Sequence, residues 1–208
     1  MISKLKSRLA LFKVVRMIWA FIHYLSDDFQ TGRFRGILFI SLGNLLPDLF
    51  SCAVIRAMLW RLAGAQLADY STTIIRSGAF TEYPANLVAG KNFQINRSTY
   101  LGTNGQILIG NYVTISLNCS ILTVSHSGLS HEVDEIEPVV IKSNCLIYAN
   151  CTVLPGSVLE EGVVLAAGSV LKGNTVPWAV YAGVPAKLVK LRDSDIDPSK
   201  QDVSINVN

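Results

Sequence analysis

The chain has 208 residues and a formal net charge of only +3, with half of its residues hydrophobic and 16% charged. This length fits one main domain with a sizeable core. The low charge and the lack of a basic patch interleaved with aromatic residues argue against nucleic-acid binding. No small-residue cleavage site follows the basic start, so the four cysteines are expected in a reduced, cytoplasmic setting.

Residues 1–70 are expected to form apolar and basic helices. The run 37–55 is long and apolar enough to suggest a membrane span, but Asn44, Pro47 and Asp48 stand at its centre. A charge at that depth costs about 2.5–3.5 kcal/mol. The sequence therefore predicts two short helices that are broken at Pro47.

Beyond that break, apolar residues recur at helical spacing, and Arg56 and Arg61 take the positions predicted to face water. The earlier apolar run 14–25 is too short to span a bilayer. With the basic residues before it, this run could lie on an anionic membrane surface. The alternative is that it packs on the main domain or on a neighbouring subunit.

Large aliphatic residues recur every six positions through the second half of the chain. Neither a helix nor a strand explains this period. A coil with three short strand faces per turn does, because each face contributes one large and one small inward side chain. The large positions are Ile95, Leu101, Ile109, Ile115, Ile121, Ile141, Ile147, Val153, Leu159, Leu165 and Leu171, and the predicted turn residues are Asn104, Asn118, Asn144, Asn150, Gly156, Gly162, Gly168 and Asn174.

Two slips interrupt the six-residue period. Two residues are added between Leu101 and Ile109, and a longer insertion separates Ile121 from Ile141. An insertion in a solenoid has to leave the core as a loop, because inward positions cannot change register without becoming exposed. The longer slip carries two of the three histidines and predicts a loop that projects from the coil.

Three of the cysteines fall at the small inward position of the period. These are Cys119, Cys145 and Cys151, whereas Cys52 lies in the helical segment. We therefore interpret the three as packed small hydrophobic residues, not as metal ligands, disulfides or nucleophiles.

Two motifs close the repeats, AAGSVLK at 166–172 and VYAGVPAK at 180–187. With the period, they resemble the hexapeptide-repeat acetyltransferases, in the branch of maltose, galactoside, colanic-acid and other polysaccharide O-acetyltransferases. The resemblance begins near MLWRLAGA at 58–65. It implies an all-β solenoid, a left-handed parallel β-helix with N-terminal α-helical segments and one projecting loop. We expect helices over 1–70, the coil over 71–185, and a closing segment with a polar tail over 186–208.

The resemblance also implies an activity. Family members use acetyl-CoA as acyl donor and are typically homotrimers with active sites between neighbouring coils. We therefore expect an O-acetyltransferase that acts on a sugar hydroxyl of a bacterial surface polysaccharide or its precursor, with no metal and no nucleic-acid partner. The apolar N-terminus adds the expectation of a cytoplasmic protein with peripheral association at the inner face of the inner membrane.

Four residues are candidates for the reaction itself. His126, in a Thr-Val-Ser-His motif, takes the family position of the general base, and an imidazole pKa of about 6.5 suits proton removal near neutrality. Asn96, in a Gly-Lys-Asn-Phe-Gln-Ile-Asn motif, takes the position beside the reacting groups and could hold the acceptor or the thioester carbonyl. Ser125 or backbone N–H groups could meet the oxyanion, and His131 could line the acceptor pocket.

Acetyl-CoA is expected along the coil, with its phosphates near cations at the C-terminal end. By position, the family contacts to this donor are matched by Ser116, Ala149, Ala167, Lys172, Gly173 and Lys187, and Lys190 is a further candidate phosphate partner. The chain departs from the family pattern where Leu-Ile-Tyr148 replaces Trp-Ile-Gly and where Lys172-Gly173 replaces Thr-Lys.

Three alternatives remain open at this point. N-acetylation of a nucleotide-linked amino sugar would need a similar base. A γ-class carbonic anhydrase would use His126 and His131 as a zinc pair, but it needs a third histidine from the coil, and the remaining one is His23, outside the repeats. The third alternative is a scaffold with a degenerate site.

Overall fold

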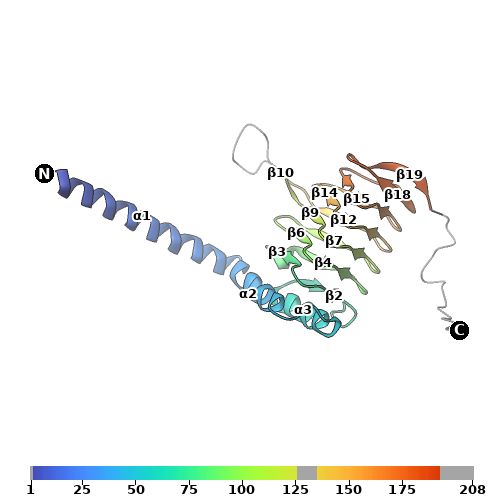
Figure 1. The fold of residues 1–208 in the computed structure, drawn as a ribbon, viewed down its shortest axis with the longest axis horizontal. Coiled ribbons are helices and arrows are strands. Elements are labelled where there is room, and N and C mark those ends of the chain that lie inside the picture. Colours follow the sequence, from blue (N-terminus) through green and yellow to red (C-terminus); the bar gives the residue numbers. More distant parts are fainter. Residues whose placement is uncertain (1, 126–134, 193–208) are drawn as a thin grey trace.

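The computed structural model describes the backbone of residues 2–125 and 135–192, with side chains from residue 15 onward. Three helices lead into a coil of short parallel strands (Figure 1). The helices are α1 (Ile2–Gln30), α2 (Arg33–Asn44) and α3 (Phe50–Ala63). The break between α2 and α3 falls at Pro47, as predicted. No helix among the described residues combines the length and the apolarity that crossing a bilayer requires.

Arg56 corrects the prediction for the second helix. Its side chain is fully buried and donates hydrogen bonds to the carbonyl oxygens of Gly43 (3.0 Å), Leu46 (2.7 Å) and Pro47 (2.9 Å). The last carbonyls of a helix have no partner within the helix, and here the guanidinium supplies one. The prediction that Arg56 faces water is therefore wrong, whereas Arg61 is exposed as predicted.

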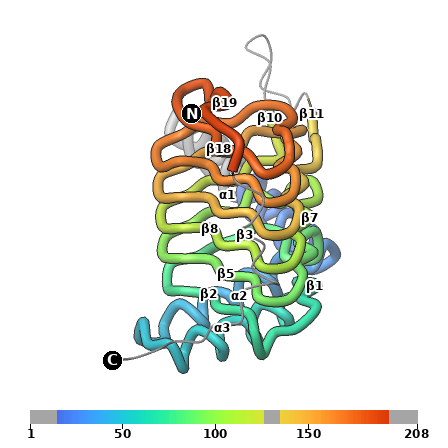
Figure 2. Tube along the Cα trace, turned by 90° about the vertical axis from the view of Figure 1, so that its right-hand side faces the viewer, coloured from blue at the N-terminus to red at the C-terminus, as the bar shows by residue number. Residues whose placement is uncertain are grey.

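The coil has three parallel sheets, one on each face (Figure 2). We name them A, B and C in the order in which the chain visits them, and we name each corner by the two sheets that it joins. Sheet A holds β1 (Gln66–Leu67), β4 (Leu87–Ala89), β7 (Ile107–Ile109), β12 (Val139–Ile141) and β15 (Val158–Leu159). Sheet B holds β2 (Ile74–Ile75), β5 (Gln94–Ile95), β8 (Thr114–Ile115), β13 (Leu146–Ile147), β16 (Val164–Leu165), β18 (Ala179–Ala182) and β19 (Lys187–Leu191). Sheet C holds β3 (Phe80–Thr81), β6 (Tyr100–Gly102), β9 (Ser120–Leu122), β14 (Thr152–Val153) and β17 (Val170–Leu171). The first strand thus begins ahead of the boundary that was expected at residue 71.

The six-residue period is confirmed as the inward pattern of this coil. All eleven large positions are buried, and the three repeat cysteines are buried beside them. The backbone is left-handed at most of the predicted turn residues, namely Asn118, Asn144, Asn150, Gly156, Gly162 and Gly168. Asn104 and Asn174 are exceptions, and near the end of the coil Gly173 takes the left-handed conformation in place of Asn174.

Both slips of the period fall at the C–A corner. Gln94 pairs with Thr114, twenty residues later, whereas Leu146 pairs with Val164, eighteen residues later. In the early turns two extra residues lengthen the corner that follows sheet C, and in one of these turns this corner contains the short 3-10 helix η1 (Pro84–Asn86). In the third turn β10 (Val124–Ser125) and β11 (Glu135–Ile136) form an antiparallel pair at the base of the projecting loop. Residues 126–134 lie outside the described residues.

Each end of the coil is closed by a different element. At the start, α3 packs on β2, and the buried side chains of Ala57 and Trp60 join the coil core. At the other end, β19 turns back and pairs antiparallel with β18. Figure 2 shows α3 and β19 at opposite ends of the stack.

Candidate functional site

Several predicted site residues line up along the B–C corner. Asn96 and Ser116 each follow a strand of sheet B, and their backbone N–H groups donate to the carbonyls of Ile115 (2.9 Å) and Ile147 (2.8 Å) of the next turn. Ala149 and Ala167 follow sheet B in the next two turns, and the N–H of Gly168 donates to the carbonyl of Ala149 (2.9 Å). Asn96 and Ser116 are the first residues after their strands and Ala149 and Ala167 are the second after theirs, so the four lie along one corner of the coil in two adjacent register positions.

Lys187 lies at the C-terminal end of the same line. It pairs with Ala182 across the antiparallel β18–β19 register, and Ala182 ends β18, the last parallel strand of sheet B, at the B–C corner. Its side chain is exposed. The B–C corner thus carries small residues that end at a cation.

Tyr148 belongs to this line although the sequence did not single it out as a site residue. It directly follows β13, its N–H donates to the carbonyl of Leu165 (2.9 Å), and its side chain is 50% exposed. The phenol ring therefore stands beside the line, between Ser116 and the following turns. The sequence signal for this aromatic residue was the departure of Leu-Ile-Tyr148 from the Trp-Ile-Gly pattern of the family.

Three further predicted residues lie at the opposite corner. Lys172 and Gly173 follow β17 of sheet C, and Ser125 belongs to β10, which leaves the coil after β9 of the same sheet. All strands of sheet C run from the B–C corner to the C–A corner. Asn96 and Ser125 are therefore separated by the width of sheet C within one chain. His126 and His131 lie outside the described residues.

A cluster of charges lies at the B–C corner next to Asn96, and sequence reasoning missed it. Asp48, from the turn before α3, accepts hydrogen bonds from Arg76 Nε and Nη2 (both 2.9 Å) and from Arg97 Nε. Asn96 donates its side-chain N–H to the carbonyl of Ile115 (3.2 Å). The Arg76 guanidinium holds the pKa of the Asp48 carboxyl well below its usual range, against the opposing effect of burial. This carboxylate is therefore suited to holding the corner, not to accepting a proton.

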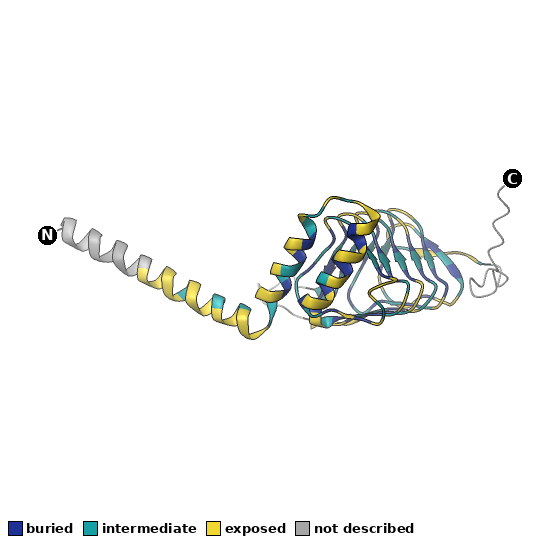
Figure 3. Cartoon of the chain, turned by 90° about the horizontal axis from the view of Figure 1, so that it is seen from below, coloured by how far each residue is buried: buried dark blue, intermediate teal, exposed yellow. Residues whose placement is uncertain are grey.

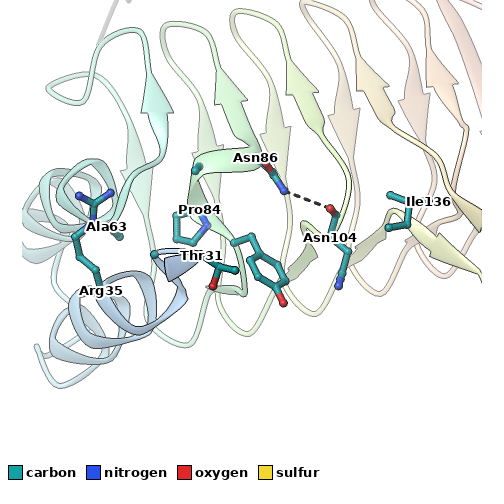
Figure 4. A pocket seen from close by; sticks show the side chains of 10 residues that line it. Thr31, Arg35, Ala63, Pro84, Asn86, Asn104 and Ile136 are labelled. Atoms are coloured by element: carbon teal, nitrogen blue, oxygen red, sulfur yellow. Dashed lines mark hydrogen bonds between the residues drawn. The ribbon is translucent and has the colours of Figure 1, made fainter. Parts of the chain in front are cut away.

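A cavity of about 420 Å³ lies at the C–A corner, close to the base of the projecting loop (Figure 4). It lies between the α1–α2 turn and the extended corners of the early turns, and Ile136 of β11 belongs to its wall. Asn86 donates from Nδ2 to the carbonyls of Thr103 (2.9 Å) and Asn104 (3.3 Å), which fixes one side of it. The polar side chains that line the cavity are those of Thr31, Arg35, Tyr83, Asn86 and Asn104. The two-residue slip near Asn104 was the sequence signal for this corner.

The cysteines take no part in these arrangements. Burial raises the pKa of the Cys145 thiol to about 12. The hydrogen bond with Cys151 and burial raise the pKa of the Cys119 thiol. All four thiols are free and buried. Within residues 15–125 and 135–192, no three His, Cys, Asp or Glu side chains are grouped as metal ligands.

Comparisons with known proteins identify the repeat. The family model for the bacterial transferase hexapeptide, six repeats, matches residues 138–173. A search of curated protein sequences finds no match. The match and the solved structures described next confirm the resemblance to hexapeptide-repeat acetyltransferases.

Three solved structures share the fold over most of both chains. The maltose O-acetyltransferase of Clostridium difficile 630 is 24% identical, with a TM-score of 0.68, over 77% of this chain and 86% of that one. A hexapeptide-repeat acetyltransferase from Vibrio cholerae is 21% identical, with a TM-score of 0.71, over 80% and 93%. A galactoside acetyltransferase in complex with coenzyme A is 20% identical, with a TM-score of 0.71, over 81% and 84%.

Proposed function

The chain carries the bacterial transferase hexapeptide repeat on a left-handed β-helix, and from this premise we propose that it transfers acetyl from acetyl-CoA to a sugar hydroxyl. The acceptor is a bacterial surface polysaccharide or its precursor, and the protein works in the cytoplasm. The observation that carries the proposal is the line of small residues at the B–C corner that ends at Lys187. The similarity to a galactoside acetyltransferase bound to coenzyme A supports it.

The line at the B–C corner suits the acyl donor. Ser116, Ala149 and Ala167 leave room for an extended pantetheine chain, and backbone groups at the corner offer it hydrogen bonds. Lys187 supplies positive charge for the phosphates at the end of that chain. In this arrangement the pantetheine passes the ring of Tyr148, and Lys172 and Gly173 contact the donor from a neighbouring copy.

A homotrimer explains why the proposed catalytic residues are divided between two corners. The outward side chains of sheet A are aliphatic at Val88, Leu108, Val140 and Val158, and those of sheet B at Ile74, Leu146, Val164 and Val180. A three-fold arrangement packs sheet A of one copy against sheet B of the next. It brings the C–A corner of one copy beside the B–C corner of its neighbour. His126 and Ser125 of one copy then face Asn96 of the next.

Transfer in this site needs no covalent enzyme intermediate. The imidazole of His126 removes the acceptor's hydroxyl proton while the oxygen attacks the thioester carbonyl carbon. The C–O bond forms and the carbonyl becomes an oxyanion, which Ser125 or corner N–H groups stabilise, with Asn96 positioning the reacting groups. Collapse breaks the C–S bond, and the imidazolium returns the proton to the coenzyme A sulfur.

The cavity at the C–A corner is the proposed entry for the acceptor. Its amide, hydroxyl and guanidinium groups suit the hydroxyl-rich surface of a glycan. His131 is proposed to contact the acceptor from the loop. One observation favours a second acceptor class: an N-acyltransferase from Bacillus cereus, in complex with dTDP and coenzyme A, is 21% identical with a TM-score of 0.51, over 64% of this chain and 80% of that one. An amine of a nucleotide-linked amino sugar is therefore the alternative.

The test uses two variants that remove residues from opposite corners. We expect His126→Ala to lower acetyl-CoA turnover at least about 100-fold with a responsive glycan or amino-sugar acceptor, because it removes the base. Asn96→Ala is expected to lower it as well. Release of free coenzyme A thiol is measured, and light scattering checks that each variant keeps the oligomeric state of the wild type.

Co-expression of the two variants under different tags tests the shared site. Purification through both tags selects trimers that contain both variants, and each of these has one intact site of three. Turnover should therefore recover to about one third of the wild-type rate. No recovery would contradict a site between copies, and full turnover by His126→Ala would contradict the proposed base.

A further inference from the structure

The outward face of α2 and α3 is apolar, although it is turned away from the coil. Helices that cap a solenoid bury one face and normally present charged side chains on the other. Here ten large hydrophobic side chains are 37–81% exposed, and the exposed polar residues of the two helices are Arg35, Ser41, Ser51 and Arg61. We call this surface the apolar end face; it comprises Phe34, Leu38, Leu42, Leu45, Leu49, Phe50, Val54, Ile55, Met58 and Leu62.

The apolar end face is separate from the surface that packs on the coil. α2 buries Ile40, and α3 buries Ala57 and Trp60 on the coil side. Leu38 and Leu42 are four residues apart and neighbour each other on the outward side of α2. Figure 3 shows exposed residues on the sides of α2 and α3 opposite the buried ones. Both helices are therefore apolar on two sides, and the coil covers only one.

The described part of α1 continues this surface. Between residues 15 and 30, the side chains of Arg16, His23, Asp27 and Gln30 share a strip of about 60°, whereas Asp28 lies outside this strip and pairs with Arg33 (3.8 Å). Most of the rest of its circumference is apolar and exposed, and Trp19 has 68% of its surface accessible. A wide apolar face with a narrow polar strip is typical of a helix that lies in a membrane interface.

Charge is distributed in a way that favours an anionic partner. Residues 1–64 contain nine lysines and arginines and three aspartates, a net charge of +6, whereas residues 65–208 contain nine basic and twelve acidic residues, a net charge of −3. Asp48 is the one acidic residue of α2, α3 and their connection, and the ion pairs with Arg76 and Arg97 neutralise it. Arg35 and Arg61 are exposed beside the apolar end face.

We infer that the apolar end face and α1 bind the surface of an anionic lipid bilayer. Apolar side chains enter the boundary of the hydrocarbon region while the arginines meet lipid phosphates. A second copy of the chain fits the same face less well, because α2, α3 and their connection offer no free carboxylate to pair with the exposed Arg35 and Arg61 of another copy. Since no helix in the described part of the chain is long and apolar enough to cross a bilayer, this binding is at the membrane surface. This inference goes beyond the proposed transfer reaction, since lipid binding needs neither donor nor acceptor.

Vesicle flotation of the full chain tests the inference. We expect the wild type to float with phosphatidylcholine vesicles that contain about 30% phosphatidylglycerol, and to float less with pure phosphatidylcholine or in about 0.5 M salt. A variant with the four substitutions Phe34→Ser, Leu38→Ser, Met58→Ser and Leu62→Ser should bind the anionic vesicles at least about tenfold more weakly than the wild type. The matched control replaces Tyr112 and Leu117, exposed apolar residues of the coil, by serine and should bind like the wild type.

A second measurement needs no substitution in the apolar end face. Emission of Trp19 should shift to shorter wavelength when anionic vesicles are added, and Trp19→Phe should remove the shift. The inference is overturned if the wild type does not float with anionic vesicles. It is also overturned if the folded serine variant floats as well as the wild type. A further contrary result would be a serine variant that no longer forms the oligomer of the wild type, together with a wild type that binds no lipid. The last result would make the face an interface between copies.

Discussion

Arg56 offers a stability test whose size follows from its contacts. The fully buried guanidinium donates to three carbonyls at 3.0 Å or less, and the Ile75 carbonyl lies at 3.5 Å from Nη1. Each charge-assisted bond contributes about 1.5–3 kcal/mol net, and the desolvation of a buried cation opposes their sum by several kcal/mol. Arg56→Met fills the space but satisfies no carbonyl. We expect it to lower the free energy of unfolding by about 3 kcal/mol.

The matched substitutions for Arg56 separate geometry from charge. Arg56→Lys keeps the charge but cannot reach carbonyls on both sides, so a loss of about 2 kcal/mol is expected. Arg61→Met removes an exposed arginine with one backbone bond, to Leu67 (3.2 Å), and should cost less than about 1 kcal/mol. Urea unfolding followed by circular dichroism measures all three. A loss below about 1 kcal/mol for Arg56→Met would refute the view that the guanidinium holds the α2–α3 connection.

Two further predictions concern the coil and the B–C corner. Asp48→Asn should destabilise the protein by about 2 kcal/mol at pH 7, because the bonds from Arg76 and Arg97 weaken. The pKa of Asp48 is lowered in the folded protein, so its contribution to the free energy of unfolding is fully present above the unfolded pKa of about 4 and is lost as the pH falls below that value. Urea titrations measure the difference in free energy of unfolding between the wild type and Asp48→Asn. An equal difference at pH 7 and pH 3 would contradict this argument. Gly162→Ala should lower the free energy of unfolding by about 2–3 kcal/mol in the same assay. The backbone at this position is left-handed, and an added Cβ would lie 2.4 Å from the Trp178 ring. An unchanged urea midpoint would count against this prediction.

The coil was predictable because its core repeats along a single axis, so each turn packs only on the turns before and after it. Each inward residue contacts neighbours six or about twenty positions away, so the period alone identifies Ile147 or Leu165 as buried. The break at Pro47 was predictable for a local reason, since proline removes a helical hydrogen bond. The slips showed where the coil opens, because an insertion has no place in the core.

The contacts of the helical cap could not be read from the sequence in the same way. Arg56 occupies a position at which an arginine in an amphipathic helix normally faces water, and only the fold shows that free carbonyls lie within its reach. The pairing of Asp48 with Arg97 joins residues from the cap and the second turn, which no period connects. At the candidate site, the sequence indicated the line at the B–C corner, but the opposite placement of Ser125 required the strand directions of sheet C.

The closed ends of the coil limit how copies of the chain can associate. A stack of parallel strands leaves N–H and C=O groups free at its last turn, and such an edge can recruit the first turn of another copy. β19 runs against the direction of the coil, so its free edge does not continue the parallel register, and α3 covers the opposite end. End-to-end growth into a fibre is thereby disfavoured. In the proposed homotrimer, the contacts between coils lie along the long sides of the prism, and three copies form a closed ring.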